Sequence, residues 1–277
     1  MSYAEKEKLG IMKKAINRLN YKRIILFFLF LFIFSLIVTI ICFKTFKYRH
    51  ISKYITDDNK IIYTIGTIHS SHYENKLYNY TYEQLINLIR NTKATHVFIE
   101  SRKETFENYN AIDGPSEMEI IYAYCLDNDI DVHFIDSWSF SDNMMVNTFD
   151  NSRDNKIFNN ILNELLDIPK NETIAIFYGA THYETQKSKN FKAGWEELKI
   201  KNKSLLFDST TKFSYSKSTI EVLENTKEYY KSGAIDEINK NITNNDLRAE
   251  MIYKYKNEVP KYIDDVISIV KKNKNYK

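Results

Sequence analysis

Short apolar runs alternate with helical patterns along the chain from about residue 60 onward. Four of these runs have the length of buried strands, at 61–66, 95–100, 131–136 and 173–178. Helical patterns lie between and after them, over 81–90, 117–126, 153–166 and 184–199. This alternation predicts an α/β fold with a mainly parallel sheet flanked by helices.

The pattern changes toward the C-terminus. A weak strand is predicted at 204–207, and from residue 217 on the sequence is typical of Lys- and Glu-rich amphipathic helices. We therefore expect an α/β domain over 60–215, with a helical C-terminal part over 216–277 that packs on the same domain.

A long apolar run precedes the predicted domain. Residues 24–42 carry no charge and are long enough to cross a bilayer as a helix. A signal peptide would have a shorter apolar core and a small-residue cleavage site. The sequence therefore predicts a transmembrane anchor at 24–43 that contacts the lipid bilayer, after a basic N-terminal segment at 1–23.

Charge is unevenly distributed around this run. Seven Lys and Arg residues precede it and five follow it by residue 60, which favours a cytoplasmic N-terminus and an extracytoplasmic main domain. The formal net charge is +3, and because the flanks of the run hold an excess of positive charge, the remainder is mildly acidic. Nucleic acid is therefore not an expected partner. The two cysteines predict no disulfide framework.

A histidine or an acidic residue lies at or just after the end of each of the four predicted strands. His69 follows the first, Glu100 ends the second, Asp136 ends the third and His182 follows the fourth. Because ligands bind outside the carboxyl ends of parallel strands, we expect these side chains to point into one crevice. Asp also commonly caps a strand end, which is the more frequent role for Asp136.

Each of the two strand-end histidines belongs to a Gly-x-x-His motif. Gly66 precedes His69, and Gly179 precedes His182, at the same spacing. Glycine permits a tight turn that would fold the imidazole back toward the crevice. Imidazole and carboxylate groups are common ligands of divalent metals, so the set predicts a metal site or a water-activating site. A single such motif is also ordinary turn chemistry.

The other histidines are weaker candidates. His96 and His133 lie within predicted strands and are expected to pack there, whereas His50 and His72 are expected at the surface.

Five motifs, in order, resemble the TraB/PrgY/GumN and TIKI superfamily, which is distantly similar to erythromycin esterases and ChaN-like proteins. They are GTIHSS at 66–71, FIESR at 98–102, EMEI at 117–120 leading to FID at 134–136, the Arg153-Asp154 pair, and GATH at 179–182. The resemblance covers about residues 60–207. Several members of the superfamily carry their membrane segments at the C-terminal side, so the resemblance does not extend to the predicted N-terminal anchor.

The resemblance implies a metal-dependent hydrolase of peptidase or esterase type, with a peptide or a small ester as substrate. The predicted anchor at 24–43 would attach this hydrolase to a membrane. As catalytic residues, His69 and His182 would bind a divalent metal of unknown identity or, without one, orient and deprotonate water. Glu100 would be a third metal ligand or the general base. Arg153 would stabilise an oxyanion or hold a substrate carboxylate. Alternatively, Arg153 only braces the site through a salt bridge with Asp154 or Glu100.

The sequence allows two roles for each of two further residues, and it allows two functions other than a hydrolase. Glu117 either supports the site as an outer carboxylate or places a favourable charge at a helix N-terminus, and Arg102 is expected to be structural or exposed. The alternative function is a non-catalytic, anchored protein that sequesters a peptide or small ligand in the same crevice. A scaffold that acts through its C-terminal helices is the third possibility.

Overall fold

The computed structural model describes residues 26–39, 48–69, 80–143, 151–208 and 213–273. The chain divides into two compact units, residues 1–47 and residues 48–277, which are considered separately. In the first unit a helix covers residues 26–39. Among the described residues no helix has both the length and the apolar character needed to cross a bilayer. The predicted anchor at 24–43 is therefore not found there, and its ends lie outside the described residues.

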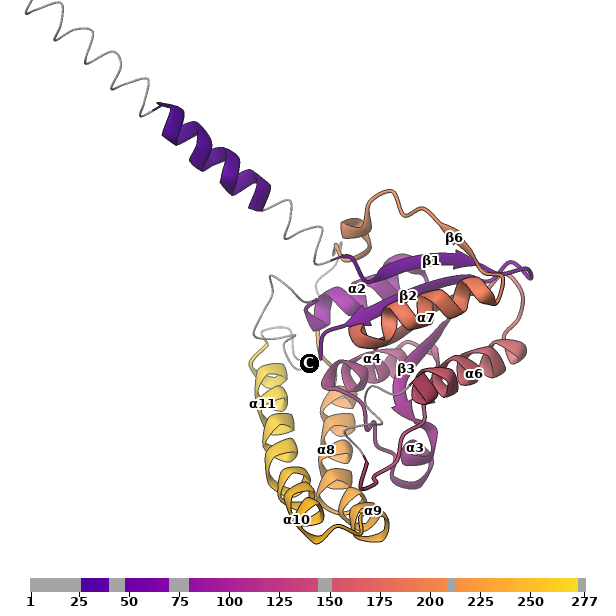
Figure 1. The fold of residues 1–277 in the computed structure, drawn as a ribbon, viewed down its shortest axis with the longest axis vertical. Coiled ribbons are helices and arrows are strands. Elements are labelled where there is room, and N and C mark those ends of the chain that lie inside the picture. Colours follow the sequence, from indigo (N-terminus) through magenta and orange to yellow (C-terminus); the bar gives the residue numbers. More distant parts are fainter. Residues whose placement is uncertain (1–25, 40–47, 70–79, 144–150, 209–212, 274–277) are drawn as a thin grey trace, which may run out of the picture. The chain divides into compact units, whose positions relative to one another are not determined.

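The second unit is built on a six-stranded sheet (Figure 1). Its strands, in spatial order, are β4 (Asp131–Asp136), β3 (His96–Arg102), β5 (Thr173–Gly179), β2 (Ile61–Thr67), β1 (Ile51–Ile55) and β6 (Glu196–Leu198). The four strands from β4 to β2 are parallel, as the alternation predicted. β1 and β6 join antiparallel at one edge, so the sheet is mixed.

Helices cover both faces of this sheet. α6 (Asn151–Asp167) and α7 (Ala180–Lys192) contribute to one buried cluster, with Ile174, Ile176 and Tyr178 of β5. The other face packs against α2 (Tyr82–Thr92) and α4 (Ser116–Asp127), with Ala175 and Phe177 of β5. Alternate residues of β5 thus enter opposite cores, which explains why its sequence is almost uniformly apolar.

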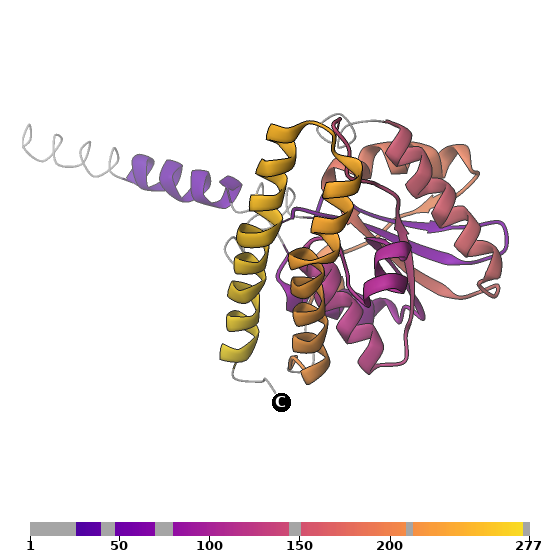
Figure 2. The same ribbon diagram turned by 90° about the horizontal axis from the view of Figure 1, so that it is seen from below.

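The helical C-terminal part lies outside α4. Its elements are α8 (Lys217–Lys231), α9 (Gly233–Asn241), α10 (Asn245–Tyr253), the π-helical turn η2 (Lys254–Glu258) and α11 (Val259–Lys272). α8 packs on α4, and α11 packs along α8 (Figure 2). Leu223, Val266 and Val270 are fully buried in the same core as α2 and α4.

Several element boundaries differ from the sequence prediction. The start of α2 is confirmed, because Thr81 and Gln84 form the predicted capping box. The helix predicted over 184–199 begins earlier, as α7 at Ala180, and its end is replaced by β6. The weak strand at 204–207 is instead a 3-10 helix, η1 (Lys203–Leu206), capped by the Asn202 side chain. The short helix α3 (Lys103–Tyr109) was not predicted.

Candidate functional site

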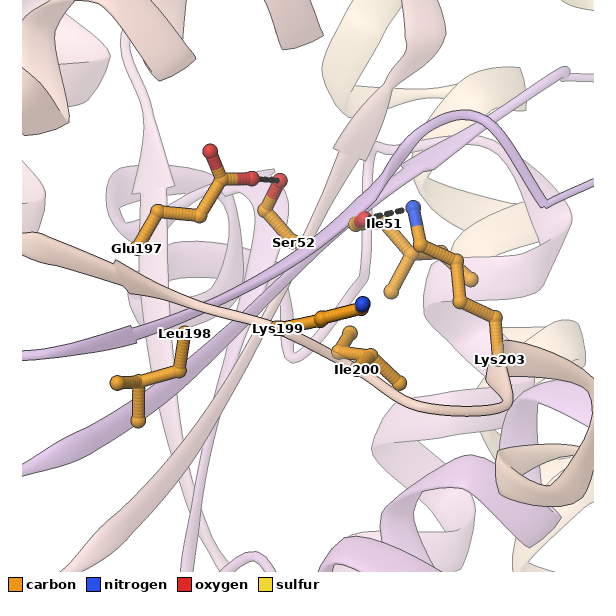
Figure 3. Close-up of a pocket in the computed structure, with 7 residues that line it drawn as sticks. All are labelled: Ile51, Ser52, Glu197, Leu198, Lys199, Ile200 and Lys203. Atoms are coloured by element: carbon orange, nitrogen blue, oxygen red, sulfur yellow. Dashed lines mark hydrogen bonds between the residues drawn. The ribbon is translucent and has the colours of Figure 1, made fainter.

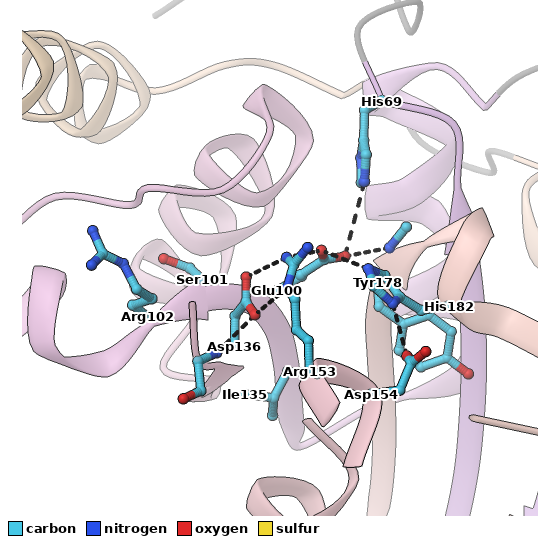
Figure 4. A network of polar contacts seen from close by, with 12 residues as sticks. His69, Glu100, Ser101, Arg102, Ile135, Asp136, Arg153, Asp154, Tyr178 and His182 are labelled. Carbon is cyan, nitrogen blue, oxygen red and sulfur yellow. Dashed lines mark hydrogen bonds and ion pairs between the residues drawn. The ribbon is translucent and has the colours of Figure 1, made fainter. Parts of the chain in front are cut away.

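Three predicted site residues surround the carboxylate of a fourth, Glu100, at the carboxyl edge of the sheet (Figure 4). His69 follows β2, Glu100 lies in β3, Arg153 lies in α6 and His182 lies in the first turn of α7. His69 Nε2 is 3.9 Å from Glu100 Oε2, and His182 Nε2 is 3.4 Å from Glu100 Oε1. Arg153 Nη2 donates to Glu100 Oε1 at 2.8 Å. Residues from four separate elements therefore meet at Glu100.

Glu100 is buried and held as an anion. Only 3% of the residue is exposed. Burial raises its pKa, but the hydrogen bond from His182 and the charges of His69, His182 and Arg153 outweigh that effect and bring the pKa to about 2. The backbone N–H of Gly179 also donates to Oε2 at the N-terminus of α7, where a helix dipole favours negative charge.

Both histidines are oriented by a second carboxylate. His69 Nδ1 donates to Glu117 Oε1 at 2.8 Å, and His182 Nδ1 donates to Asp154 Oδ1 at 2.8 Å. Each imidazole consequently presents Nε2 toward Glu100. A carboxylate on the far nitrogen of an imidazole is the usual support of a metal-ligating histidine, because it fixes the tautomer and the ring orientation.

The same carboxylates raise the pKa of both imidazoles. For His182, burial lowers the pKa, but the hydrogen bonds to Asp154 and Glu100 raise it to about 9. For His69, burial again acts downward, while the charge and hydrogen bond of Glu117 and the charge of Glu100 shift the pKa upward overall. Without a bound cation, the site therefore favours the protonated form of His182 at neutral pH.

Arg153 forms a bridge between two carboxylates. Its Nε and Nη2 atoms donate to the two oxygens of Asp136 at 3.0 and 2.7 Å, in addition to the bond to Glu100. Asp136 also accepts from the backbone N–H of Ser137 at 2.7 Å, so it caps the end of β4 as well. The sequence suggested Asp154 or Glu100 as the salt-bridge partner of Arg153. In the structure Arg153 pairs with Glu100 and also with Asp136.

Asp154 was considered from the sequence only as a partner of Arg153, yet its carboxylate binds His182. Gln186, one turn after His182, holds it there by donating to the backbone oxygen of Asp154 at 2.9 Å. Glu117 was considered mainly as a helix N-terminal charge, yet its carboxylate binds His69 and accepts from Thr67 Oγ1 at 2.8 Å. The only sequence signal for either was a carboxylate at the start of a helix.

The two motif glycines, Gly66 and Gly179, are needed for close packing. The prediction that they permit a tight turn is therefore wrong. Gly66 lies within β2, opposite Tyr178, and Gly179 has an ordinary φ of −59°. A side chain at Gly179 would collide with His69 Nε2 and would lie 3.4 Å from Glu100 Oε2. Gly66 is enclosed by Ala180 Cα at 3.1 Å. His182 correspondingly follows β5 with no loop between them.

A divalent metal suits the chemistry of the donors, although they are not yet arranged around one. Two neutral imidazole nitrogens and a carboxylate oxygen form a common catalytic donor set. In the described part of the chain, however, no group of three or more His, Cys, Asp and Glu side chains could hold a metal ion in its present arrangement. Here Nε2 of His182 instead hydrogen-bonds to Glu100, so coordination requires loss of a proton and a small shift of these side chains.

A cavity of about 340 Å³ lies away from these residues, where the chain leaves β6 beside β1 (Figure 3). Lys203 donates there to the backbone oxygen of Ile51 at 2.6 Å, and Ser52 donates to Glu197 at 2.7 Å. None of the four predicted site residues lines it. We therefore place the candidate site by its chemistry rather than by this cavity.

No family model, curated protein or solved structure gave a significant match to this chain. The resemblance to the TraB/PrgY/GumN and TIKI superfamily stays a prediction that rests on the five ordered motifs.

Proposed function

We propose that the protein is a metal-dependent hydrolase whose site comprises His69, Glu100 and His182. One observation carries the proposal: two carboxylate-oriented imidazoles present Nε2 to the same buried carboxylate, at 3.9 and 3.4 Å. Structural ion pairs do not need two histidines fixed in this way, whereas a centre that binds a cation or activates water does. The substrate class, a peptide or a small ester, follows from the resemblance alone.

The three residues are suited to hold a divalent ion, which would act as a Lewis acid toward a substrate carbonyl and toward water. His182 must lose the Nε2 proton that it shares with Glu100 before it can act as a ligand. Asp154 then keeps the remaining proton on Nδ1, just as Glu117 does for His69. Loading of the site is therefore expected to improve as pH rises.

The solvent exposure of the site residues indicates which of them contacts a substrate and which hold the site in place. The side chain of His69 is 38% exposed and is the member of the set that a substrate meets first. Glu100 and His182 are buried and keep their positions without a substrate. Arg153 acts through Glu100 and Asp136 as a positioning residue, because its contacts with them hold both carboxylates in place.

A binding protein without turnover is the second candidate. It is favoured by the engagement of both Glu100 oxygens, one with Arg153 and the other with Gly179 N–H. A carboxylate tied in this way, with a pKa of about 2, is a weak proton acceptor. In this alternative the site holds a cation or ligand and performs no bond cleavage.

The function is tested with the purified full-length chain in detergent, freed of metals and resupplied with Zn²⁺, Mn²⁺ or Co²⁺ one at a time. Peptide and ester libraries are screened for cleavage. We expect cleavage that requires a metal and falls at least about 100-fold in His69→Ala and in His182→Ala, but not in the control His50→Ala. Metal-independent cleavage, or equal rates in all variants, would contradict the proposal.

We further propose that residues 24–43 anchor the chain in a membrane, with the main domain on the extracytoplasmic side. The proposal rests on the uncharged run at 24–42 and on the excess of basic residues before it. The full-length chain should stay in the membrane fraction after alkaline carbonate extraction, and added protease should reach the domain in sealed, right-side-out membrane vesicles. Release of the full-length chain by carbonate would refute the anchor, and complete protection from protease would refute the orientation.

A further inference from the structure

Two other histidines face each other at the opposite end of β3 from the candidate site. His96 begins β3, four residues before Glu100, which places it about 13 Å away along the strand. His133 lies in the neighbouring strand β4, opposite Phe98. His96 Nδ1 and His133 Nε2 are 3.1 Å apart. From the sequence both were expected only to pack within strands.

We propose that His96 and His133, joined by Asp131, form a second site for a divalent transition metal such as Zn²⁺. This site is independent of the proposed hydrolytic centre.

The spacing of the donor atoms supports this site. Two ligand atoms that each lie 2.0–2.1 Å from a tetrahedral Zn²⁺ are separated by about 3.4 Å. The imidazole nitrogens, at 3.1 Å, are close to that separation. Asp131 Oδ2 is 3.6 Å from His96 Nδ1 and approaches the same nitrogen that faces His133.

In their present positions, the described residues contain no group of three or more His, Cys, Asp and Glu side chains that could hold a metal ion. The proposed site therefore requires Asp131 to move. The two histidines are partly buried, with side chains 12% and 16% exposed, and are therefore preset. The Asp131 side chain is 77% exposed and can rotate inward to complete the set.

A fourth residue supports His133 from behind. Glu164 of α6 accepts a hydrogen bond from His133 Nδ1 at 2.7 Å and thereby directs Nε2 toward His96. Burial and the neighbouring His133 lower the pKa of His96, which favours the neutral imidazole that a metal requires. Asp131 and Glu172 provide the compensating negative charge near His96.

The proposed site also has a structural consequence. A cavity of about 170 Å³ lies beside His133, although neither His96 nor Asp131 lines it. An ion bound between the two histidines would cross-link the outer strand β4 to β3 and, through Glu164, to α6. Its expected effect is to stabilise this edge of the sheet.

The test uses untagged, full-length protein and Zn²⁺ as the probe, titrated against a chromophoric zinc chelator. His69→Ala/His182→Ala disables the other candidate site. This variant should still bind one Zn²⁺ per chain, and adding His96→Ala/His133→Ala should abolish that binding. The inference is overturned if the first variant binds no Zn²⁺, or if the added changes leave its affinity unaltered. Failure of the proposed hydrolytic function would not affect this result.

Two single changes keep the test informative if the quadruple variant does not fold. His133→Gln in the otherwise natural chain keeps a donor for Glu164 but removes the ligand, so the number of bound Zn²⁺ ions should fall by one. Glu164→Gln should weaken the same binding step about tenfold. His50→Ala serves as the control histidine. An unchanged number of bound Zn²⁺ ions in His133→Gln would refute the site. The contact between His96 and His133 would then be only a structural hydrogen bond.

Discussion

Asp154 Oδ1 lies 2.8 Å from His182 Nδ1 and thereby directs the other imidazole nitrogen to Glu100. Asp154→Asn should lower the pKa of His182 from about 9 toward its ordinary value near 6.5, because the amide removes the charge. Metal affinity should fall about 10- to 100-fold. NMR titration of the imidazole and calorimetric metal titration measure the two effects. Asp167→Asn, at an exposed position of the same helix, should change neither, and an unaltered His182 pKa in Asp154→Asn would refute this role.

Gly179→Ala should damage the site more than the fold. The backbone at φ −59° accepts alanine, but the new Cβ would displace His69 from its position beside Glu100. A ligand misplaced by about 1 Å is expected to reduce hydrolysis about 100-fold, while the free energy of unfolding changes by about 1 kcal/mol or less. Gly194→Ala is the matched control. Gly194 has φ 82° and no neighbour within 4 Å of an added Cβ, so its replacement should cost stability and leave hydrolysis unaltered.

The stability of the metal-free protein should depend on the proton of His182. The pKa of His182 is raised from 6.5 to about 9 in the folded state, so its contribution is complete below pH 6.5 and is lost as pH rises through 9. The shift corresponds to about 3 kcal/mol in the free energy of unfolding. Urea denaturation at pH 6 and pH 9.5 measures it. His182→Asn should flatten this part of the profile, and an equally steep loss in that variant would assign the effect to another group.

Arg102 connects the end of β3 to the C-terminal helices. Its guanidinium pairs with Asp113, donates to Glu237 at 2.9 Å and to Tyr229 at 2.6 Å, and lies 4.2 Å from the Trp138 ring centroid. Arg102→Met should lower the free energy of unfolding by about 3–5 kcal/mol, because the buried Asp113 carboxylate keeps the hydrogen bonds from Ser101 and Thr105 but loses the positive charge that it pairs with.

Chemical denaturation with a matched variant tests this expectation for Arg102. Lys103→Met, at the next position and with a side chain that is 62% exposed, should change the free energy of unfolding by less than about 0.5 kcal/mol. Similar small effects in both variants would show that Arg102 does not tie the helices to the sheet.

Local pattern and one topological rule accounted for the centre of the fold. The four apolar runs became β2, β3, β4 and β5. Burial is nearly continuous along the central strands β3 and β5, which leaves a strong sequence signal, whereas the edge strand β4 is buried only at its end. Because ligands bind outside the carboxyl ends of parallel strands, the predicted strands then placed His69, Glu100 and His182 at one candidate site. By contrast, β6 is only Glu-Glu-Leu, and its strand conformation comes from pairing with β1. No local pattern encodes that pairing.

The roles of the carboxylates required three-dimensional information. Asp154 reaches His182 only because α6 packs beside α7, and Glu117 reaches His69 only because α4 begins near the end of β2. Both look like ordinary helix N-terminal acids in sequence. The same limit applies to His96 and His133, whose contact depends on the register of β3 against β4.

The most direct test of the central claim compares the full-length chain with Glu100→Gln in metal titration and in turnover. Glutamine keeps the size of the side chain and an acceptor for Arg153, but removes the negative charge between the two imidazoles. We predict that the natural chain binds a divalent ion and cleaves a peptide or ester, and that Glu100→Gln loses at least about 100-fold in turnover. Tight ligand binding without cleavage, unaffected by Glu100→Gln, would contradict the account and identify a binding protein instead.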